Sequence, residues 1–193
     1  FDYLNLKACE IAKKTKEYYP NILIAGGLPP QNSTYKVDDR AENKICEDFY
    51  NQAKLLNPFI DFFYLDVLSS FKEIKIALDR TKEFNKPYLI GIHISKGTKL
   101  PSGEKISDII NRLKDQKLLG VILSCVSPEN YELNINEIKN IGVPFGFKLN
   151  GYLQTKPLPK HGLKNKDNEF VQPNKFLGKR EDLTPERMLK FVK

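Results

Sequence analysis

Apolar and polar positions follow two different periods along the chain, and the periods predict strands and helices in turn. Five short runs are almost continuously apolar, which is typical of strands buried on both faces. They cover residues 21–30, 59–68, 86–95, 118–127 and 143–151. The other segments carry apolar residues every three or four positions, which indicates amphipathic helices. These helices are expected over residues 3–19, 37–56, 69–84, 102–116 and 127–141.

Local signals refine the expected elements. The first helix has an apolar face that we expect to be buried, formed by Leu4, Ala8, Ile11 and Ala12. Pro20 ends this helix, and the pair Gly26-Gly27 predicts a tight turn after the first strand. Near the end of the chain, Thr184 and Pro185 form the cap and first turn of another helix.

Repeated strand-then-helix units indicate an α/β protein with a parallel sheet. Two architectures compete at this point: an open doubly wound sheet and a (β/α)8 barrel. The first strand–helix connection has no GxGxxG motif, so a dinucleotide-binding sheet is not supported. A complete barrel needs about 250 residues, and the pattern supplies five strands. Residues 152–182 are polar, basic and aperiodic, which predicts a long loop.

Composition and charge exclude several functional classes. The chain has 193 residues and a net charge of +7, and much of this charge lies in residues 156–193, with ten Lys/Arg and five acids. No nucleic-acid-binding motif accompanies it, so we expect a solvated surface and no nucleic-acid partner. No apolar run approaches the length of a membrane span. Three cysteines without a CxxC pair fit a reducing, cytoplasmic compartment.

Candidate chemistry lies at the carboxyl ends of the strands, where parallel α/β proteins place their active sites. Cys125 terminates GVILSC in the fourth run and directly precedes the VSP start of a predicted helix, where a thiolate is favoured. It can be a nucleophile, a metal ligand or a small buried apolar residue. Asp66 interrupts an apolar strand, so it needs a partner or a function unless it faces water.

Other polar residues favour structural interpretations. His93 has no Cys or His neighbour in the sequence, so we interpret it as a hydrogen-bonded core histidine. Cys9 and Cys46 lie on apolar helix faces and are expected to serve packing. Asn150-Gly151 at the end of the fifth run is compatible with a simple turn.

Several strand ends, taken in order, resemble the homocysteine S-methyltransferase family. IAGGLPPQNSTY (24–35) resembles the AGSLPP…SY segment of that family, and IDFFYLDVLSSFKEIKIAL (60–78) resembles its vDlfllETisslkEakaAl. GVILSCVSPE (120–129) is similar to GvNCxsPe, and FKLNG (147–151) to the PNsG or KPNaG strand end. GKREDLTPERMLKFVK (178–193) resembles the segment before the last strand of that family.

The resemblance implies a (β/α)8 TIM-type barrel, present here as about five parallel βα units, with a zinc ion at the carboxyl rim. Cys125 matches the first of three cysteine ligands, and the two others belong to a GGCC motif, expected beyond Lys193. Asp66 stands where the family has a homocysteine-binding Glu, one methylene longer. Gly26, Gly27 and Asn150 match its AG and PN positions and are the further substrate-binding candidates. Ser124 replaces the Asn of GvNC.

The preferred hypothesis is a zinc-dependent homocysteine S-methyltransferase that moves a methyl group from a small donor to homocysteine and yields methionine. Residues 1–193 are then expected to be one barrel domain truncated at both ends and inactive alone, with residues 152–182 as a loop within it. The first alternative is a non-catalytic α/β module that binds a ligand or partner and has a buried structural cysteine. The second is a metal-independent barrel enzyme that uses Asp66 and His93 as acid and base.

Overall fold

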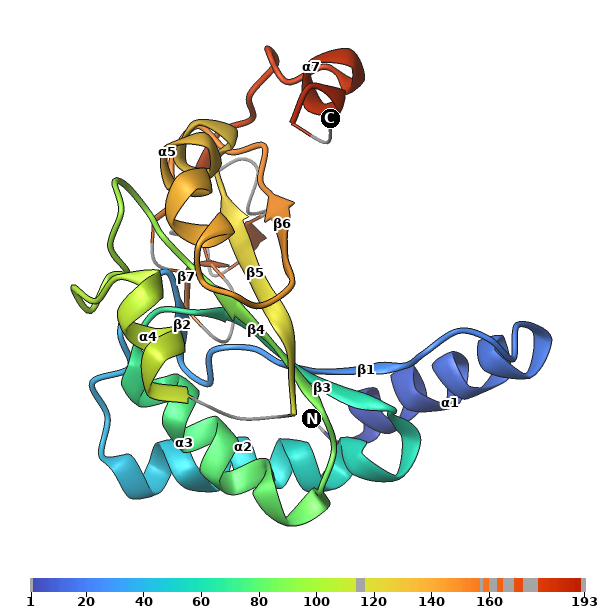
Figure 1. Ribbon diagram of the computed structural model, residues 1–193. Helices are drawn as coiled ribbons and strands as arrows, with labels where there is room; N and C mark the ends of the chain where they lie inside the picture. Colours follow the sequence, from blue (N-terminus) through green and yellow to red (C-terminus); the bar gives the residue numbers. More distant parts are fainter. Residues whose placement is uncertain are drawn as a thin grey trace.

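A five-stranded parallel sheet forms the centre of the molecule (Figure 1). The computed structural model describes residues 2–113, 117–156, 158–159, 163–164, 169–171 and 177–191. The sheet has the order β1-β3-β4-β5-β6, with strands Ala25–Leu28, Phe62–Leu68, Tyr88–Ile92, Leu118–Val126 and Phe145–Leu149. Every neighbouring pair is parallel, so the five predicted strands are confirmed as parallel neighbours.

The strand order identifies the architecture as a partial (β/α)8 barrel. The strands follow one another in the sheet as they do in the chain, whereas a doubly wound sheet reverses its order at a switch point. The main helices are α1 (Asp2–Tyr18), α2 (Glu42–Leu56), α3 (Phe71–Thr81), α4 (Ile106–Leu113) and α5 (Pro128–Lys139). The short helices are η1 (Asn57–Phe59), η2 (Lys82–Phe84) and α7 (Pro185–Leu189). No helix within the described ranges is long and apolar enough to cross a bilayer.

Side-chain caps set where three helices begin. The Ser70 hydroxyl accepts from the Glu73 backbone N–H at 3.2 Å, which caps α3, and it donates to the Glu73 carboxylate at 2.7 Å. Ser127 caps α5 ahead of Pro128, and Thr184 caps α7 as predicted.

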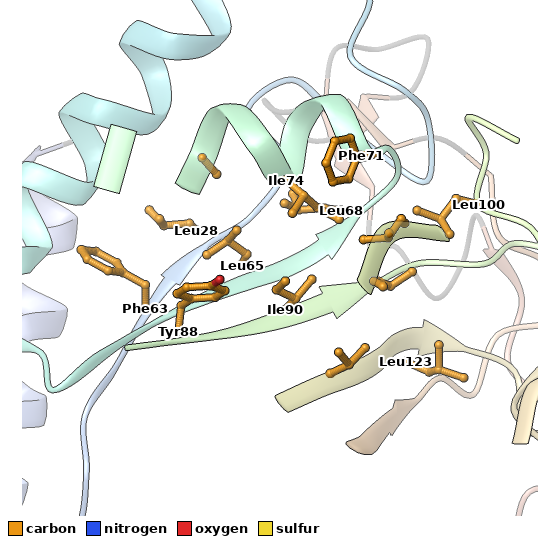
Figure 2. Packing of buried hydrophobic residues seen from close by; sticks show 14 of the residues in the cluster. Leu28, Phe63, Leu65, Leu68, Phe71, Ile74, Tyr88, Ile90, Leu100 and Leu123 are labelled. Carbon is orange, nitrogen blue, oxygen red and sulfur yellow. The ribbon is translucent and has the colours of Figure 1, made fainter. Parts of the chain in front are cut away.

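The hydrophobic core lies between the sheet and the helices that cover its outer face. Leu65, Ile90 and Leu123 come from three adjacent strands and are fully buried there, and Figure 2 shows them with Ile74 and Phe71 of α3. The opposite, inner face carries the residues between these positions, among them Tyr64, Gly91 and Ser124. The inner face therefore carries polar side chains beside apolar ones such as Leu89 and Ile122.

The first helix is confirmed, but its predicted buried face is wrong. Leu4 is 70% exposed and Ile11 is 66% exposed, whereas Cys9 is the residue of α1 that is buried. The helix is anchored at its carboxyl end instead, where Lys16 donates to the Asp61 carboxylate and the same carboxylate accepts from the Ile24 N–H. The apolar spacing is real, but tertiary contacts select another face.

Two further expectations need correction. The pair Gly26-Gly27 lies within strand β1 and forms no turn. The segment 152–182 is not a simple loop, because parts of it pair as strands: β7 (Leu158–Pro159) with β2 (Ser33–Thr34), and β8 (Leu163–Lys164) with β9 (Phe170–Val171). Tyr152 also bridges to Lys179. Backbone pairing of this kind has no apolar period, so the sequence pattern does not show it.

Candidate functional site

Backbone irregularities mark the carboxyl ends of two strands at the rim of the sheet. The register shifts between Leu65 and Leu68 in β3 and between Ser124 and Val126 in β5. Val67 (φ 61°) and Cys125 (φ 57°) lie in these bulges in the left-handed region, which side chains with a Cβ rarely adopt. Such strain costs about 1–3 kcal/mol per residue and clusters at functional sites, where bulges redirect side chains.

A small cluster at the rim surrounds the Cys125 side chain. It consists of Tyr35, Val67 and Leu177, with Cys125 and Tyr152 at its border. The Tyr35 hydroxyl lies 3.1 Å from Cys125 Sγ, and the Tyr35 ring packs on the His93 ring at a centroid distance of 4.4 Å. Cys125 is therefore held at the surface of the rim, under a tyrosine contributed from another part of the chain.

Burial and the hydrogen bond to Cys125 raise the pKa of Tyr35 well above its ordinary value. The phenol therefore stays protonated at neutral pH and donates to the sulfur. The rim therefore places a neutral hydrogen-bond donor directly against the Cys125 sulfur.

His93 is a core residue, as the sequence indicated. Its side chain is fully buried, with Nδ1 3.1 Å from the Ser124 carbonyl oxygen and Nε2 2.8 Å from the Ser95 hydroxyl. Burial lowers the pKa of His93 to about 4, so the ring is neutral at physiological pH. Both ring nitrogens are already used, which speaks against the acid–base hypothesis for His93 and Asp66.

Asn150 fixes the backbone around Cys125. Its side-chain amide donates to the Cys125 carbonyl, its backbone N–H donates to the Val126 carbonyl at 2.8 Å, and its side-chain oxygen accepts from the Tyr152 N–H at 3.1 Å. These contacts close both the bulge and the following turn. In this structure Asn150 positions the cysteine.

A hydrogen bond crosses the inner face of the sheet from β3 to β5. The Tyr64 hydroxyl and the Ser124 hydroxyl are 2.6 Å apart, and Gly91 of β4 lies between them. A Cβ at Gly91 would come within 2.5 Å of Ser124 Oγ and 3.0 Å of the Leu65 carbonyl oxygen. The missing side chain of Gly91 is thus what permits this contact.

Asp66 forms an ion pair above this contact. Lys148 of β6 donates to Asp66 Oδ2, and its ammonium lies 5.7 Å from the centre of the Tyr64 ring. The other oxygen, Asp66 Oδ1, is buried and has no hydrogen-bond partner among the described residues. Asp66 and Ser124 share the inner face, since Ser124 pairs with Lys148 in the sheet register.

The two candidate glycines, Gly26 and Gly27, lie on opposite faces of β1. Gly26 is buried on the outer face, where a Cβ would come within 2.4 Å of the Ile60 side chain. Gly27 pairs with Tyr64, and a Cβ there would meet nothing within 4 Å. Gly27 therefore leaves open space beside Tyr64 on the inner face, whereas Gly26 is needed for packing.

Sequence reasoning named Cys125, Asp66 and Asn150 but did not assign roles to their partners Tyr35, Tyr64 and Lys148. The available signal was strand alternation, which puts Tyr64 on the face of Asp66. Tyr35 ends the segment IAGGLPPQNSTY, but nothing in its spacing indicates that it reaches Cys125.

A zinc ion of the kind that the family resemblance implies needs at least three protein ligands. Within the described ranges, no three His, Cys, Asp or Glu side chains gather in a group that could hold a metal ion. Cys125 is the thiol of the rim cluster, and the nearby His93 nitrogens are both hydrogen-bonded. The described residues therefore do not fit zinc on their own.

A parallel βα barrel segment with polar strand ends on one rim defines a class of α/β-barrel proteins whose sites lie at that rim. The family model for homocysteine S-methyltransferase matches residues 1–193, and the chain belongs to this family.

No curated protein matches the chain. Among solved structures, the chain is similar to Rhizobium etli pyruvate carboxylase T882A with the allosteric activator acetyl coenzyme-A, at 19% identity and a TM-score of 0.47. The match covers 72% of this chain and 14% of the carboxylase chain. This low similarity supports no statement about function.

Proposed function

We propose that the chain forms the homocysteine-binding part of a homocysteine S-methyltransferase. In the reaction the bond between a small methyl donor and its methyl group breaks, a bond from that methyl to the homocysteine sulfur forms, the thiol loses its proton, and methionine results. One observation carries the proposal: Asp66 and Cys125 lie at the bulged carboxyl ends of β3 and β5 in a chain that matches the family over its whole length.

Each site residue has a stated role in this proposal. The Asp66 carboxylate binds the substrate ammonium, and Gly27 leaves room for the substrate beside Tyr64. Asn150 holds the bulge, so that Cys125 faces the rim under Tyr35. Cys125 supplies one thiolate of a zinc site that needs two further cysteine ligands, and residues 1–193 act as one domain.

The test is homocysteine binding, followed by NMR on the isotope-labelled chain. Addition of homocysteine is expected to shift the amide signals of Asp66 and Gly27, and Asp66→Asn is expected to weaken binding at least tenfold, because it removes the charge that faces the ammonium. Asp79→Asn on the exposed surface of α3 is the matched control. Absence of binding by the wild-type chain contradicts the proposal and favours the non-catalytic module.

The zinc part of the proposal is tested separately, in a longer chain that carries further cysteines. Cys125→Ala should remove zinc from that protein, because two remaining thiolates are too few for tight binding. Cys46→Ala should leave the zinc content unchanged. Equal zinc in the Cys125→Ala variant and the wild type would show that Cys125 is not a ligand.

A further inference from the structure

We propose that Lys148 is the residue that selects an α-amino acid at this site. In the free protein its ammonium pairs with Asp66, in the place that the substrate ammonium takes on binding. In the complex Lys148 binds the substrate carboxylate instead. This inference rests on the proposed function and deepens it. The observation behind it is that Asp66, which binds the substrate ammonium in the proposed function, already forms an ion pair with Lys148 from the carboxyl end of another strand.

The geometry brings two opposite charges to one point of the inner face. Lys148 of β6 reaches Asp66 of β3 across the inner face, although β4 and β5 lie between these two strands in the sheet order. The hydrogen bond between the Tyr64 and Ser124 hydroxyls lies next to this pair on the same face. The pair lies at the level of the bulges, on the rim where Cys125 also lies.

Asp66 is only partly satisfied by Lys148. Oδ2 accepts from the ammonium, but Oδ1 is buried and has no hydrogen-bond partner in the part of the chain that the structure describes. A buried carboxylate oxygen without a donor is costly. A substrate ammonium can take the place of the Lys148 ammonium on Asp66, because both groups carry three N–H donors and one positive charge, so the exchange keeps the ion pair of Asp66.

Lys148 is able to move in this way. Its side chain is 44% exposed, whereas that of Asp66 is 22% exposed, so the lysine is the more solvent-accessible partner of the pair. A long, flexible lysine stem reorients at small cost when its ammonium stays in contact with water. The Tyr64 ring, 5.7 Å from Nζ, keeps the ammonium near the site through a cation–π contact.

An α-amino acid has one charge for each partner of the ion pair, an ammonium for Asp66 and a carboxylate for Lys148. Its ammonium and carboxylate are attached to the same carbon, so a substrate ammonium on Asp66 brings the carboxylate next to the displaced Lys148. A ligand with only the ammonium leaves Lys148 without a partner, and a ligand with only the carboxylate has to share Lys148 with Asp66. The pair therefore selects the zwitterion over either half.

The experiment compares three thiols with the same carbon spacing: homocysteine, 3-mercaptopropylamine without the carboxylate, and 4-mercaptobutyrate without the ammonium. NMR titration of the 193-residue chain gives the Kd for each. Lys148→Met, which keeps the stem and removes the charge, should weaken homocysteine at least tenfold, because a charge-assisted hydrogen bond is lost. It should leave 3-mercaptopropylamine unchanged or tighter, because Asp66 is no longer occupied. Lys139→Met on the exposed end of α5 is the matched control.

The outcomes separate the inference from the proposed function. If the wild type binds homocysteine but Lys148→Met weakens homocysteine and 3-mercaptopropylamine equally, Lys148 only supports the structure, and the inference is overturned while the proposed function stands. If the wild type does not bind homocysteine, the proposed function fails and the inference falls with it. Lys148→Arg provides the positive check, because it should restore discrimination between homocysteine and the amine.

Discussion

At the scale of single residues, Gly91 shows how the inner face constrains the sequence. A side chain there would collide with Ser124 Oγ, the Leu65 carbonyl oxygen and the Asp66 Cα, at 2.5, 3.0 and 3.1 Å. Two of these atoms belong to the backbone of β3, and a shift of that backbone would disturb the bulge next to Asp66. Gly146 of β6 lies on the same face, yet a Cβ there would meet only Ile122 Cγ1 at 4.0 Å.

Gly91→Ala is therefore expected to destabilise the protein by about 1–3 kcal/mol, the usual cost of overpacking, and Gly146→Ala to be close to neutral. Urea unfolding followed by circular dichroism measures both. The double variant Gly91→Ala/Ser124→Ala should recover part of the loss, since it removes one of the colliding atoms. Equal midpoints for the two single variants would refute the close contact.

The same residues show what the sequence can predict at this scale. Asp66 and Cys125 stand out because each is a polar or reactive residue at the end of an apolar run. Their partners do not stand out, because Lys148 is one of many lysines and Tyr35 precedes Cys125 by 90 positions. Contacts between distant strand ends follow from sheet register and bulges, and neither has a period that a sequence pattern displays.

At the scale of elements, helix α3 carries a buried acid, Glu73, in its first turn. Burial raises the pKa of Glu73 to about 7 from its ordinary value of 4.5, and the neighbouring Asp38 charge adds to the effect. The folded protein then holds this proton more strongly than the unfolded chain. The stability that comes from Glu73 is fully present below about pH 4.5 and is lost as the pH rises through 7.

Glu73→Gln keeps the Ser70 cap on the backbone N–H of residue 73 but removes this titration. The variant should gain stability relative to the wild type from pH 4.5 to 7, by up to about 3 kcal/mol on the scale of 1.36 kcal/mol per pKa unit. In the variant, the lowered pKa of His93 should dominate, and stability should fall as the pH drops from 6.5 towards 4. Urea midpoints at several pH values check both slopes. A constant difference between the variant and the wild type would show that Glu73 titrates normally.

Helix α1 offers a second prediction at this scale. Its apolar positions were predictable, but the face that packs was not, because the exposed residues Leu4 and Ile11 have the same spacing as a buried stripe. Cys9→Ser places a hydroxyl in a buried position and should cost about 1–3 kcal/mol. Ile11→Ser, two residues further on the exposed face, should change the free energy of unfolding by less than about 0.5 kcal/mol. The reverse order of the two costs in urea unfolding would mean that the predicted face is the buried one after all.

At the scale of the whole molecule, the segment 177–191 folds back onto the rim and closes the cluster around Cys125. Leu177 is fully buried beside Tyr35 and Val67, and the Gly178 carbonyl accepts from the Leu153 N–H at 3.0 Å. Arg180 fastens this segment to α5: its guanidinium donates to both Glu129 carboxylate oxygens, at 2.7 and 2.8 Å, and lowers the pKa of that acid to about 2. The architecture of the sheet could be predicted from sequence periodicity. The closure of the cluster could not, because it depends on contacts of an aperiodic segment.

The closure predicts that Cys125 reactivity depends on residues far from it in the sequence. Leu177→Ala and Arg180→Met should both raise the rate at which iodoacetamide alkylates Cys125 several-fold, because each loosens the segment that covers the rim cluster. Lys179→Met, which breaks only an exposed pair with Glu181, is the matched control and should leave the rate unchanged. Peptide mass spectrometry reports Cys125 separately from Cys9, whose burial in the α1 interface makes it an internal reference for global unfolding. If Cys125 reacts at the wild-type rate in both variants, the segment does not shield it. If the alkylation rate of Cys9 rises in parallel with that of Cys125, the variants have opened the whole fold, and the reactivity of Cys125 does not depend on this segment alone.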